Sequence, residues 1–274
     1  MIYLDNAATS FHKPDCVPRA VVEAMQHAGN SGRGSSGEAM AASRLIFNTR
    51  CQIAEMFDIW GPECVAFTSN DTEALNIALQ GTLHPEEETV HAICTEMDHN
   101  SVLRPMYRLE KNGMKLTILP ADCKGRISLT ELEAAIRPET KVIVCTHASN
   151  LTGNLNDIHA IGAIAQKYQK LFIVDAAQTA GVFPISMKKD HIDILCFSGH
   201  KGLMGPQGTG AICVRPGVAV EPLKVGGSGV LTFQREHPQD MPEALEAGTL
   251  NSHGIAGLGA AISWIRETGT EQIR

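Results

Sequence analysis

A single lysine stands where an apolar run gives way to glycine-rich chain. The run DILCFSG, residues 193–199, is followed by His200, Lys201 and the stretch GLMGPQGTG, residues 202–210. A lysine at a rigid strand end can form a Schiff base with a carbonyl group, and the glycines after it would let backbone approach a bound molecule without Cβ clashes. Covalent chemistry at Lys201 is therefore the first hypothesis.

Further polar residues follow other apolar runs. They are Asp98 and His99 after residues 92–95, His147 and Asn150 after 142–145, Asp175 after 171–174, and Ser198 beside the lysine. The polar turn SNDTEALN, residues 69–76, predicts a helix that begins at about Thr72, where free N–H groups and the helix dipole favour a phosphate. In a parallel sheet the ligand crevice lies beyond the carboxyl ends of the strands, so we expect these residues to gather at one edge.

Each of these residues has a structural alternative. Asp175 is compatible with a helix N-cap, His99 and His147 with satisfied core histidines, and Thr72 with an ordinary first-turn position. Their joint placement favours a bound cofactor, because burying an aspartate and a lysine costs several kcal/mol unless something pairs with them. Pyridoxal 5'-phosphate (PLP) suits the set, since it needs a lysine, a carboxylate at its pyridine nitrogen and an anion site for its phosphate.

The elements that position these residues alternate along the chain. Strands are predicted at 63–68, 89–95, 115–119, 141–146, 171–175 and 193–198, and helices at 72–80, 101–111, 129–136 and 158–168. This alternation predicts an α/β fold whose mostly parallel sheet is covered by helices on both faces. Residues 210–215 follow their predecessor across a loop too short for a crossover, which predicts one antiparallel strand.

Composition excludes several classes of protein. The chain has 274 residues, 43% of them hydrophobic, and a net charge of −7 without clustered basic residues, so no nucleic-acid partner is expected. No apolar run reaches membrane-spanning length and no secretory leader is recognisable, which predicts no membrane partner and a cytoplasmic protein. Eight cysteines show neither metal-ligand spacing nor a disulfide pattern, so no metal is expected.

A family resemblance rests on eight runs taken in order. YLDNAAT, GRG, FTSNDTEALN, EMDHNSVLRP, HASNLTG, VDAAQTAG, FSGHKGLMGPQGTG and EAGTLN together resemble the class V aminotransferase superfamily, which has the fold-type I PLP-dependent transferase architecture, and most closely its cysteine desulfurase branch. The resemblance covers essentially the whole chain. It implies a PLP-dependent enzyme that converts L-cysteine to L-alanine and transfers sulfur to an enzyme thiol.

The resemblance also implies a role for individual residues. Lys201, Asp175 and His99 would be catalytic, as the Schiff-base lysine, the partner of the pyridine nitrogen and the residue stacked on the ring. The other implied cofactor contacts are Gln178 at the ring hydroxyl, Thr72, Ser198 and His200 at the phosphate, and Asn150 at the ring side or substrate. Thr249, after Gly248, would reach the phosphate of a neighbouring subunit, which implies a homodimer with shared active sites, and Arg33 would line the substrate entrance.

Two departures from the family pattern stand out. Asn70 and Asp71 occupy a phosphate turn in which relatives commonly carry small residues. Because a carboxylate facing a phosphate is repulsive, we expect Asp71, although part of the cofactor site, to turn outward and either cap the helix or pair with its dipole. The nucleophilic cysteine and the carboxylate-binding arginine of desulfurases lie in a C-terminal small domain and have no counterpart before Arg274, so we expect a truncated form or a fragment.

The expected organisation follows from this. Residues 13–250 would form the PLP-binding large domain, while 1–12 and 251–274 would form an N-terminal segment and the beginning of an incomplete small α+β domain. Besides an amino-acid substrate, a sulfur-acceptor protein is a candidate partner. Two alternatives stay open at this point: another class V PLP enzyme (an aminotransferase, selenocysteine lyase or C–S lyase) and a non-catalytic module with the same fold.

Overall fold

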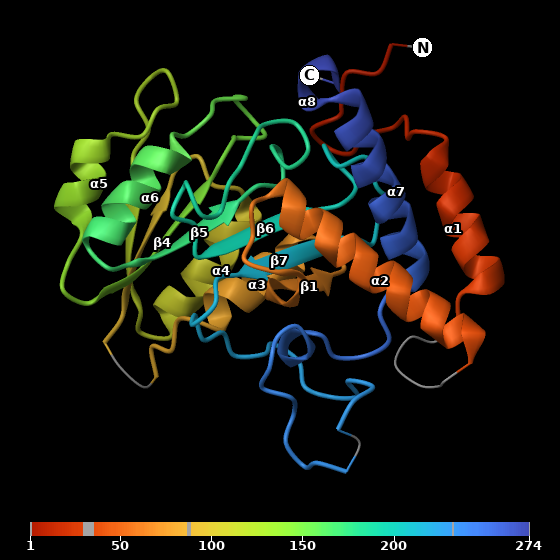
Figure 1. Ribbon diagram of the computed structural model, residues 1–274. Coiled ribbons are helices and arrows are strands. Elements are labelled where there is room, and N and C mark those ends of the chain that lie inside the picture. Colours follow the sequence, from red (N-terminus) through yellow and green to blue (C-terminus); the bar gives the residue numbers. More distant parts are fainter. Residues whose placement is uncertain (1, 30–35, 87–88, 232, 274) are drawn as a thin grey trace.

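Seven strands form one mixed sheet at the centre of the molecule (Figure 1). The computed structural model describes residues 2–29, 36–86, 89–231 and 233–273. The strands are β1 (Val65–Thr68), β2 (His91–Thr95), β3 (Lys115–Leu119), β4 (Thr140–Thr146), β5 (Leu171–Asp175), β6 (Ile194–Ser198) and β7 (Gly210–Val214), in the order β1-β7-β6-β5-β4-β2-β3. Every predicted strand is present. The first predicted strand, 63–68, is shorter than expected: residues 63 and 64 belong to a short 3₁₀ helix, η1 (Pro62–Cys64), which begins at Pro62.

The strand β7 runs against its neighbours, as predicted. It pairs antiparallel with β6, where Cys196 faces Ile212, and antiparallel with β1, where Val65 faces Cys213. The pairs β2–β3, β2–β4, β4–β5 and β5–β6 are all parallel. The carboxyl ends of β2, β4, β5 and β6 consequently lie at the same edge of the sheet.

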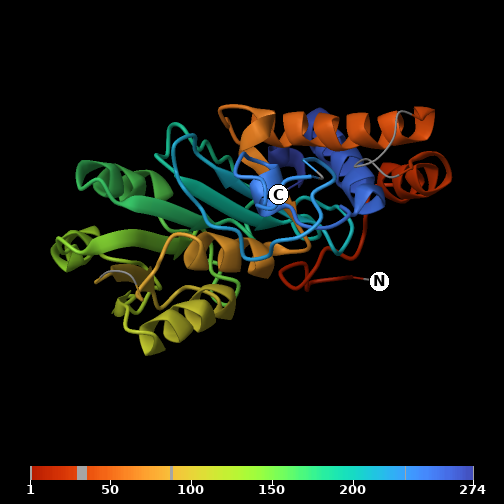
Figure 2. The ribbon, with the colours of Figure 1, turned by 90° about the horizontal axis from the view of Figure 1, so that it is seen from below.

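Helices cover both faces of the sheet, which confirms the predicted layering (Figure 2). One face packs on α3 (Asp71–Gln80) and α4 (Asn100–Lys111), through residues such as Leu75 and Met106. The other packs on α2 (Gly37–Met56), α5 (Leu129–Ala135), α6 (Ile158–Lys167) and α7 (Ser252–Thr268). Strand residues alternate between the two cores: in β5, Phe172 and Val174 belong to one and Ile173 to the other.

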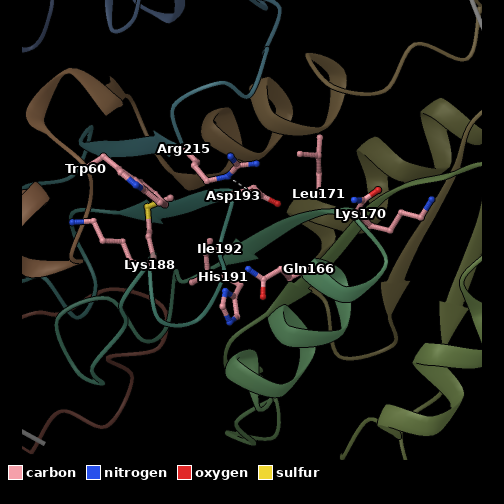
Figure 3. A pocket seen from close by; sticks show the side chains of 11 residues that line it. Trp60, Gln166, Lys170, Leu171, Lys188, His191, Ile192, Asp193 and Arg215 are labelled. Atoms are coloured by element: carbon pink, nitrogen blue, oxygen red, sulfur yellow. Dashed lines mark hydrogen bonds and ion pairs between the residues drawn. The ribbon is translucent and has the colours of Figure 1, made fainter.

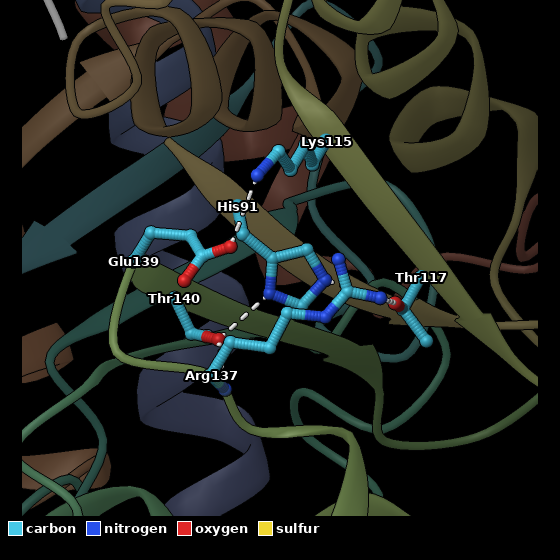
Figure 4. A network of polar contacts seen from close by, with 6 residues as sticks. All are labelled: His91, Lys115, Thr117, Arg137, Glu139 and Thr140. Carbon is cyan, nitrogen blue, oxygen red and sulfur yellow. Dashed lines mark hydrogen bonds and ion pairs between the residues drawn. The ribbon is translucent and has the colours of Figure 1, made fainter. Parts of the chain in front are cut away.

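A buried histidine holds β2 between its two parallel neighbours near their amino ends (Figure 4). The ring nitrogens of His91 lie 2.7 Å from Thr140 Oγ1 in β4 and 2.9 Å from Thr117 Oγ1 in β3. The side chain of His91 is fully buried, and burial lowers its pKa to about 4. The imidazole is therefore neutral at physiological pH and serves as a structural link.

The last described helices pack at one side of the molecule. The helix α7 lies against α1 (Cys16–His27) and α2, and the short α8 (Thr270–Ile273) follows it. Between β7 and α7 the chain makes a long excursion whose described part contains only the short η2 (Glu243–Leu245) as regular structure (Figure 1). Within the described residues, no helix is long and apolar enough to cross a membrane. The division into a large domain and part of a small one stays a prediction.

Candidate active site

The predicted chemistry-bearing residues converge on one cavity at the carboxyl edge of the sheet. Its lining contains Asp71, Thr72, His99, Asn150, Asp175, Gln178, Ser198, His200 and Lys201, together with Asn70, Ser101, Thr146, Ala148 and Ala177. They come from the ends of β2, β4, β5 and β6 and from the first turn of α3. The parallel arrangement of these strands explains why residues spread over 130 positions meet here.

Asp175 ends β5 and is almost completely buried in this cavity. Its Oδ1 accepts a hydrogen bond of 2.8 Å from the backbone N–H of Ala177, and its carbonyl accepts one of 2.8 Å from His147 N. Burial raises the pKa of the Asp175 carboxyl, and the Ala177 N–H and the Lys201 charge oppose that rise. The carboxyl is thus fixed in place and faces a cationic neighbour.

Lys201 lies in a tight turn after β6. Gly199 N donates to Thr209 O at 2.8 Å, and Gly205 N donates to Gly199 O at 2.7 Å, which folds the glycine-rich stretch back on itself. A Cβ on Gly199 would lie 2.2 Å from Thr209 Oγ1, and one on Gly202 would lie 2.5 Å from Ala180 O. Close packing within the chain therefore requires glycine at both positions. The expected approach of the glycines after Lys201 to a bound molecule stays a prediction.

The helix α3 begins with Asp71 and is capped by Asn70, whose side chain accepts a hydrogen bond of 2.9 Å from Glu73 N. The expectation that Asp71 turns outward is wrong, and Asn70 rather than Asp71 takes the capping position. Its side chain is only 5% exposed and enters the cavity, and its Oδ1 has no hydrogen-bond partner. Thr72 remains exposed in the first turn, at the end of a helix dipole that favours an anion.

His99 caps α4 at the rim of the cavity. Its Nδ1 accepts from Ser101 N at 3.2 Å and lies 2.8 Å from Ser101 Oγ, so the imidazole edge that carries Nε2 is free of this contact. The preceding residue, Asp98, is buried and accepts hydrogen bonds from Thr95 N (2.6 Å), Thr95 Oγ1 (2.9 Å) and Thr146 N. Burial raises the pKa of Asp98 to about 7. Asp98 therefore ties the ends of β2 and β4 together and sets the position of His99.

The N-terminal segment contributes to the site, which sequence reasoning missed. Ser10 Oγ and Lys13 Nζ donate to the carbonyl of His200 at 2.9 and 2.8 Å, and Thr9 Oγ1 lies 2.8 Å from His200 Nδ1. Partial burial lowers the pKa of Lys13 to about 8. The available signal was the polar run LDNAATS before the first helical pattern.

Two predicted residues lie elsewhere. Thr249 is exposed and lines two neighbouring cavities instead, next to Gly248, whose N–H donates to Gly227 O at 2.7 Å. Its predicted role toward a neighbouring subunit stays a prediction. Arg33 falls outside the described residues.

A larger cavity of 540 Å³ opens near the amino ends of β5 and β6 (Figure 3). Trp60, Lys188 and Arg215 line it, but Arg215 pairs with Asp193 at 2.6 Å and Lys188 pairs with Asp58 at 3.2 Å. Its charges are largely matched within the chain. None of the predicted site residues lines it, so the carboxyl-edge cavity is the candidate active site.

Residues 2–274 match the model of the aminotransferase class-V family. The chain belongs to the aminotransferase class-V family. Among its relatives, the "Probable cysteine desulfurase" of Methanothermobacter thermautotrophicus is 34% identical, with 100% of this chain and 68% of the relative covered. The "Cysteine desulfurase IscS" of Vibrio atlanticus is 34% identical, with 96% and 63% covered.

Solved structures agree with this assignment. The apo structure of the cysteine desulfurase from Thermococcus onnurineus superimposes with a TM-score of 0.90 at 33% identity, covering 98% of this chain and 68% of that one. A structure described as SspA in complex with cysteine gives a TM-score of 0.86 at 30% identity, covering 96% and 72%. The chain thus spans about two thirds of the length of these class V relatives.

The class V aminotransferases and their cysteine desulfurase members use PLP, and the residues of this cavity fit that cofactor. An amine, a buried carboxyl group and a helix N-terminus lie around one space, and these are the groups that a Schiff base, a pyridine nitrogen and a phosphate require. The chain is therefore a PLP-dependent enzyme of the cysteine desulfurase type that acts on an amino acid.

Proposed function

We propose that this chain provides the PLP-binding and proton-transfer machinery for conversion of L-cysteine to L-alanine. In this reaction the sulfur atom passes from the substrate thiol to an enzyme thiol, so that L-cysteine and the thiol yield L-alanine and a persulfide. The observation that carries the proposal is the convergence of Lys201, Asp175, His99 and the α3 N-terminus on one cavity.

The proposed cofactor contacts follow the cavity lining. Lys201 Nζ would hold the aldehyde carbon, Asp175 the pyridine nitrogen, and Gln178 the ring hydroxyl, with His99 against the ring face. Thr72, Ser198 and His200 would bind the phosphate and Asn150 the ring side or substrate. The hydrogen bond of 3.0 Å from Gln178 Nε2 to Ala7 O supports this arrangement, because it orients that side chain at the cavity rim.

When bound, PLP supplies an electron sink for negative charge at the substrate α-carbon. Asp175 would keep a proton on the pyridine nitrogen through a charge-assisted hydrogen bond in a low-dielectric site. Lys201 Nζ would accept the α-proton of the substrate and return a proton to the product. Water is restricted at this point because Asp175 lies in the buried part of the cavity.

The sulfur-accepting thiol is not assigned to a strand cysteine of this chain. Cys94, Cys145, Cys196 and Cys213 are buried in strands β2, β4, β6 and β7, and burial raises the pKa of their thiols. A neutral, inaccessible thiol is a poor nucleophile. The proposed assembly is a homodimer in which Thr249 reaches the site of the second subunit, with a sulfur-acceptor protein as a further partner and the cytoplasm as the location.

Borohydride reduction tests the proposal most directly. The PLP-loaded protein is expected to be yellow, and reduction followed by peptide mapping should place the cofactor on Lys201. Lys201→Ala is expected to lose both the colour and the label, whereas Lys189→Ala, at an exposed lysine remote from the cavity, should keep them. A label on another lysine, or no uptake of PLP, would refute the assignment.

A further inference from the structure

Two carboxyl groups lie in contact inside the candidate active site. The side chains of Asp71 and Asp175 line the same small cavity, are 5% and 1% exposed, and are near enough for a hydrogen bond between them to affect the pKa of both. Two carboxylates cannot make such a bond, because neither has a hydrogen to donate. We propose that Asp71 is a neutral carboxylic acid that donates a hydrogen bond to Asp175 and so holds Asp175 as the ionised partner of the cofactor ring. The functional part of this inference rests on the proposed function.

The surroundings of the pair favour one negative charge rather than two. Lys201 is the cationic neighbour of both carboxyl groups, and His99 faces Asp175. The other ionisable groups nearby are Asp98 and the thiols of Cys145 and Cys196, which add no positive charge. Like charges in contact within a low-dielectric site repel strongly, so the pair retains a proton.

The hydrogen-bond partners indicate which residue carries that proton. Asp175 Oδ1 accepts the N–H of Ala177, a contact that stabilises a carboxylate. Asp71 Oδ1 has no donor at all. Burial and the Asp175 charge both raise the pKa of Asp71, whereas the hydrogen bond from Asp71 lowers that of Asp175. The proton therefore belongs on Asp71, and Asp175 receives two donors.

This assignment gives Asp71 a positioning role. Asp175 would be held by Ala177 N–H on one side and by the Asp71 hydroxyl on the other, which fixes its orientation before PLP binds. It also explains how an aspartate is tolerated in a turn next to an anion site, because a neutral carboxyl does not repel a phosphate.

Thermal unfolding of the cofactor-free protein at several pH values tests the proton. The folded protein keeps a proton that the unfolded chain releases above about pH 4, so this group destabilises the fold increasingly as pH rises from there. Asparagine does not titrate. The melting temperature of Asp71→Asn relative to wild type is therefore expected to rise with pH, by roughly 3 °C per unit while the proton is held. The control is Asp157→Asn, at the exposed N-cap of α6, with no such trend expected.

A second measurement tests the hydrogen bond. In the PLP-loaded protein, exchange of deuterium at the α-carbon of an amino-acid substrate is expected to be about tenfold slower in Asp71→Ala. It should stay within about threefold of wild type in Asp71→Asn, which keeps an N–H donor.

The two measurements have clear contrary outcomes. A melting-temperature difference that does not change with pH would refute the neutral Asp71. Equal exchange rates in the alanine variant and wild type, or equal losses in both variants, would refute its role as a donor. If Lys201 is not labelled, the proposed function fails, but the unfolding experiment still decides the state of Asp71.

Discussion

Replacing Glu246 by glutamine tests a buried ion pair that fixes the chain before Thr249. Arg50 in α2 and Glu246 are paired at 2.7 Å, with side chains 8% and 6% exposed. Glu246 Oε1 also accepts Phe67 N in β1 at 2.6 Å, and the Arg50 guanidinium lies 4.7 Å from the centre of the Phe67 ring. The pair therefore joins the helix α2, the edge strand β1 and the segment that leads to Thr249.

The expected loss is large because glutamine leaves the arginine charge buried without a counterion. Breaking one partner of a buried ion pair costs about 3–5 kcal/mol of unfolding free energy. Glutamine keeps the shape and an oxygen for Phe67 N, so the loss reports on charge rather than on a cavity. Urea unfolding of wild type and variant would measure it directly.

Two further variants test whether the loss comes from leaving one buried charge unpaired. Glu55→Gln removes an exposed ion pair of 2.6 Å with Arg266, and it should change stability by less than about 1 kcal/mol. The double variant Arg50→Met with Glu246→Gln removes both charges, keeps an oxygen for Phe67 N and should recover most of the loss. A loss below about 1 kcal/mol in Glu246→Gln would show that the pair is dispensable and that the argument from burial is wrong.

Two predictions concern other parts of the molecule. Asp175→Asn should retain PLP but slow deuterium exchange at the substrate α-carbon by roughly a hundredfold or more, because the electron sink depends on a protonated ring nitrogen. An unchanged exchange rate would indicate that Asp175 has a purely structural role. Burial lowers the pKa of His91 to about 4 in the folded protein. Between about pH 6.5 and pH 4 the unfolded chain therefore binds a proton at this histidine that the folded protein does not bind. The free energy of unfolding consequently falls as pH decreases through that range. On acidification through that range, His91→Asn should lose less unfolding free energy than wild type, and the difference between the two losses should reach up to about 3 kcal/mol in denaturant unfolding. Equal losses in the two proteins would contradict a neutral imidazole.

Sequence periodicity predicted most strands and helices because the pattern of apolar residues within each segment is enough to indicate its secondary structure. Each strand from β2 to β7 begins and ends within two residues of its predicted range, and the short loop before β7 predicted its direction correctly. The helix α2 was not predicted, although Ala39, Ala42, Ile46 and Ile53 form one buried face at helical spacing.

The cavity was predictable to the extent that it depends on strand ends. Nine of the ten predicted cofactor-site residues lie in it because the parallel topology brings those ends together. The inward turn of Asp71 was not predictable, since it depends on Asn70 rather than Asp71 taking the capping position. The contacts of Thr9 and Ser10 with His200 join positions about 190 residues apart, and the polar run that contains Thr9 and Ser10 does not indicate which distant residue they contact.

The position of β7 between β1 and β6 has a consequence for the order in which the protein can be assembled. Val65 pairs with Cys213, so β1 has no strand to join until almost 150 further residues have been synthesised. The block from β2 to β6 can pair meanwhile, because its strands are neighbours within a shorter stretch of chain. At about 5–20 residues per second, β1 waits on the order of ten seconds on the ribosome with its apolar side chains Val65, Ala66 and Phe67 unpaired. The first strand to be made is thus the last to enter the sheet, and this interval is when a nascent chain is most exposed to aggregation and to chaperones.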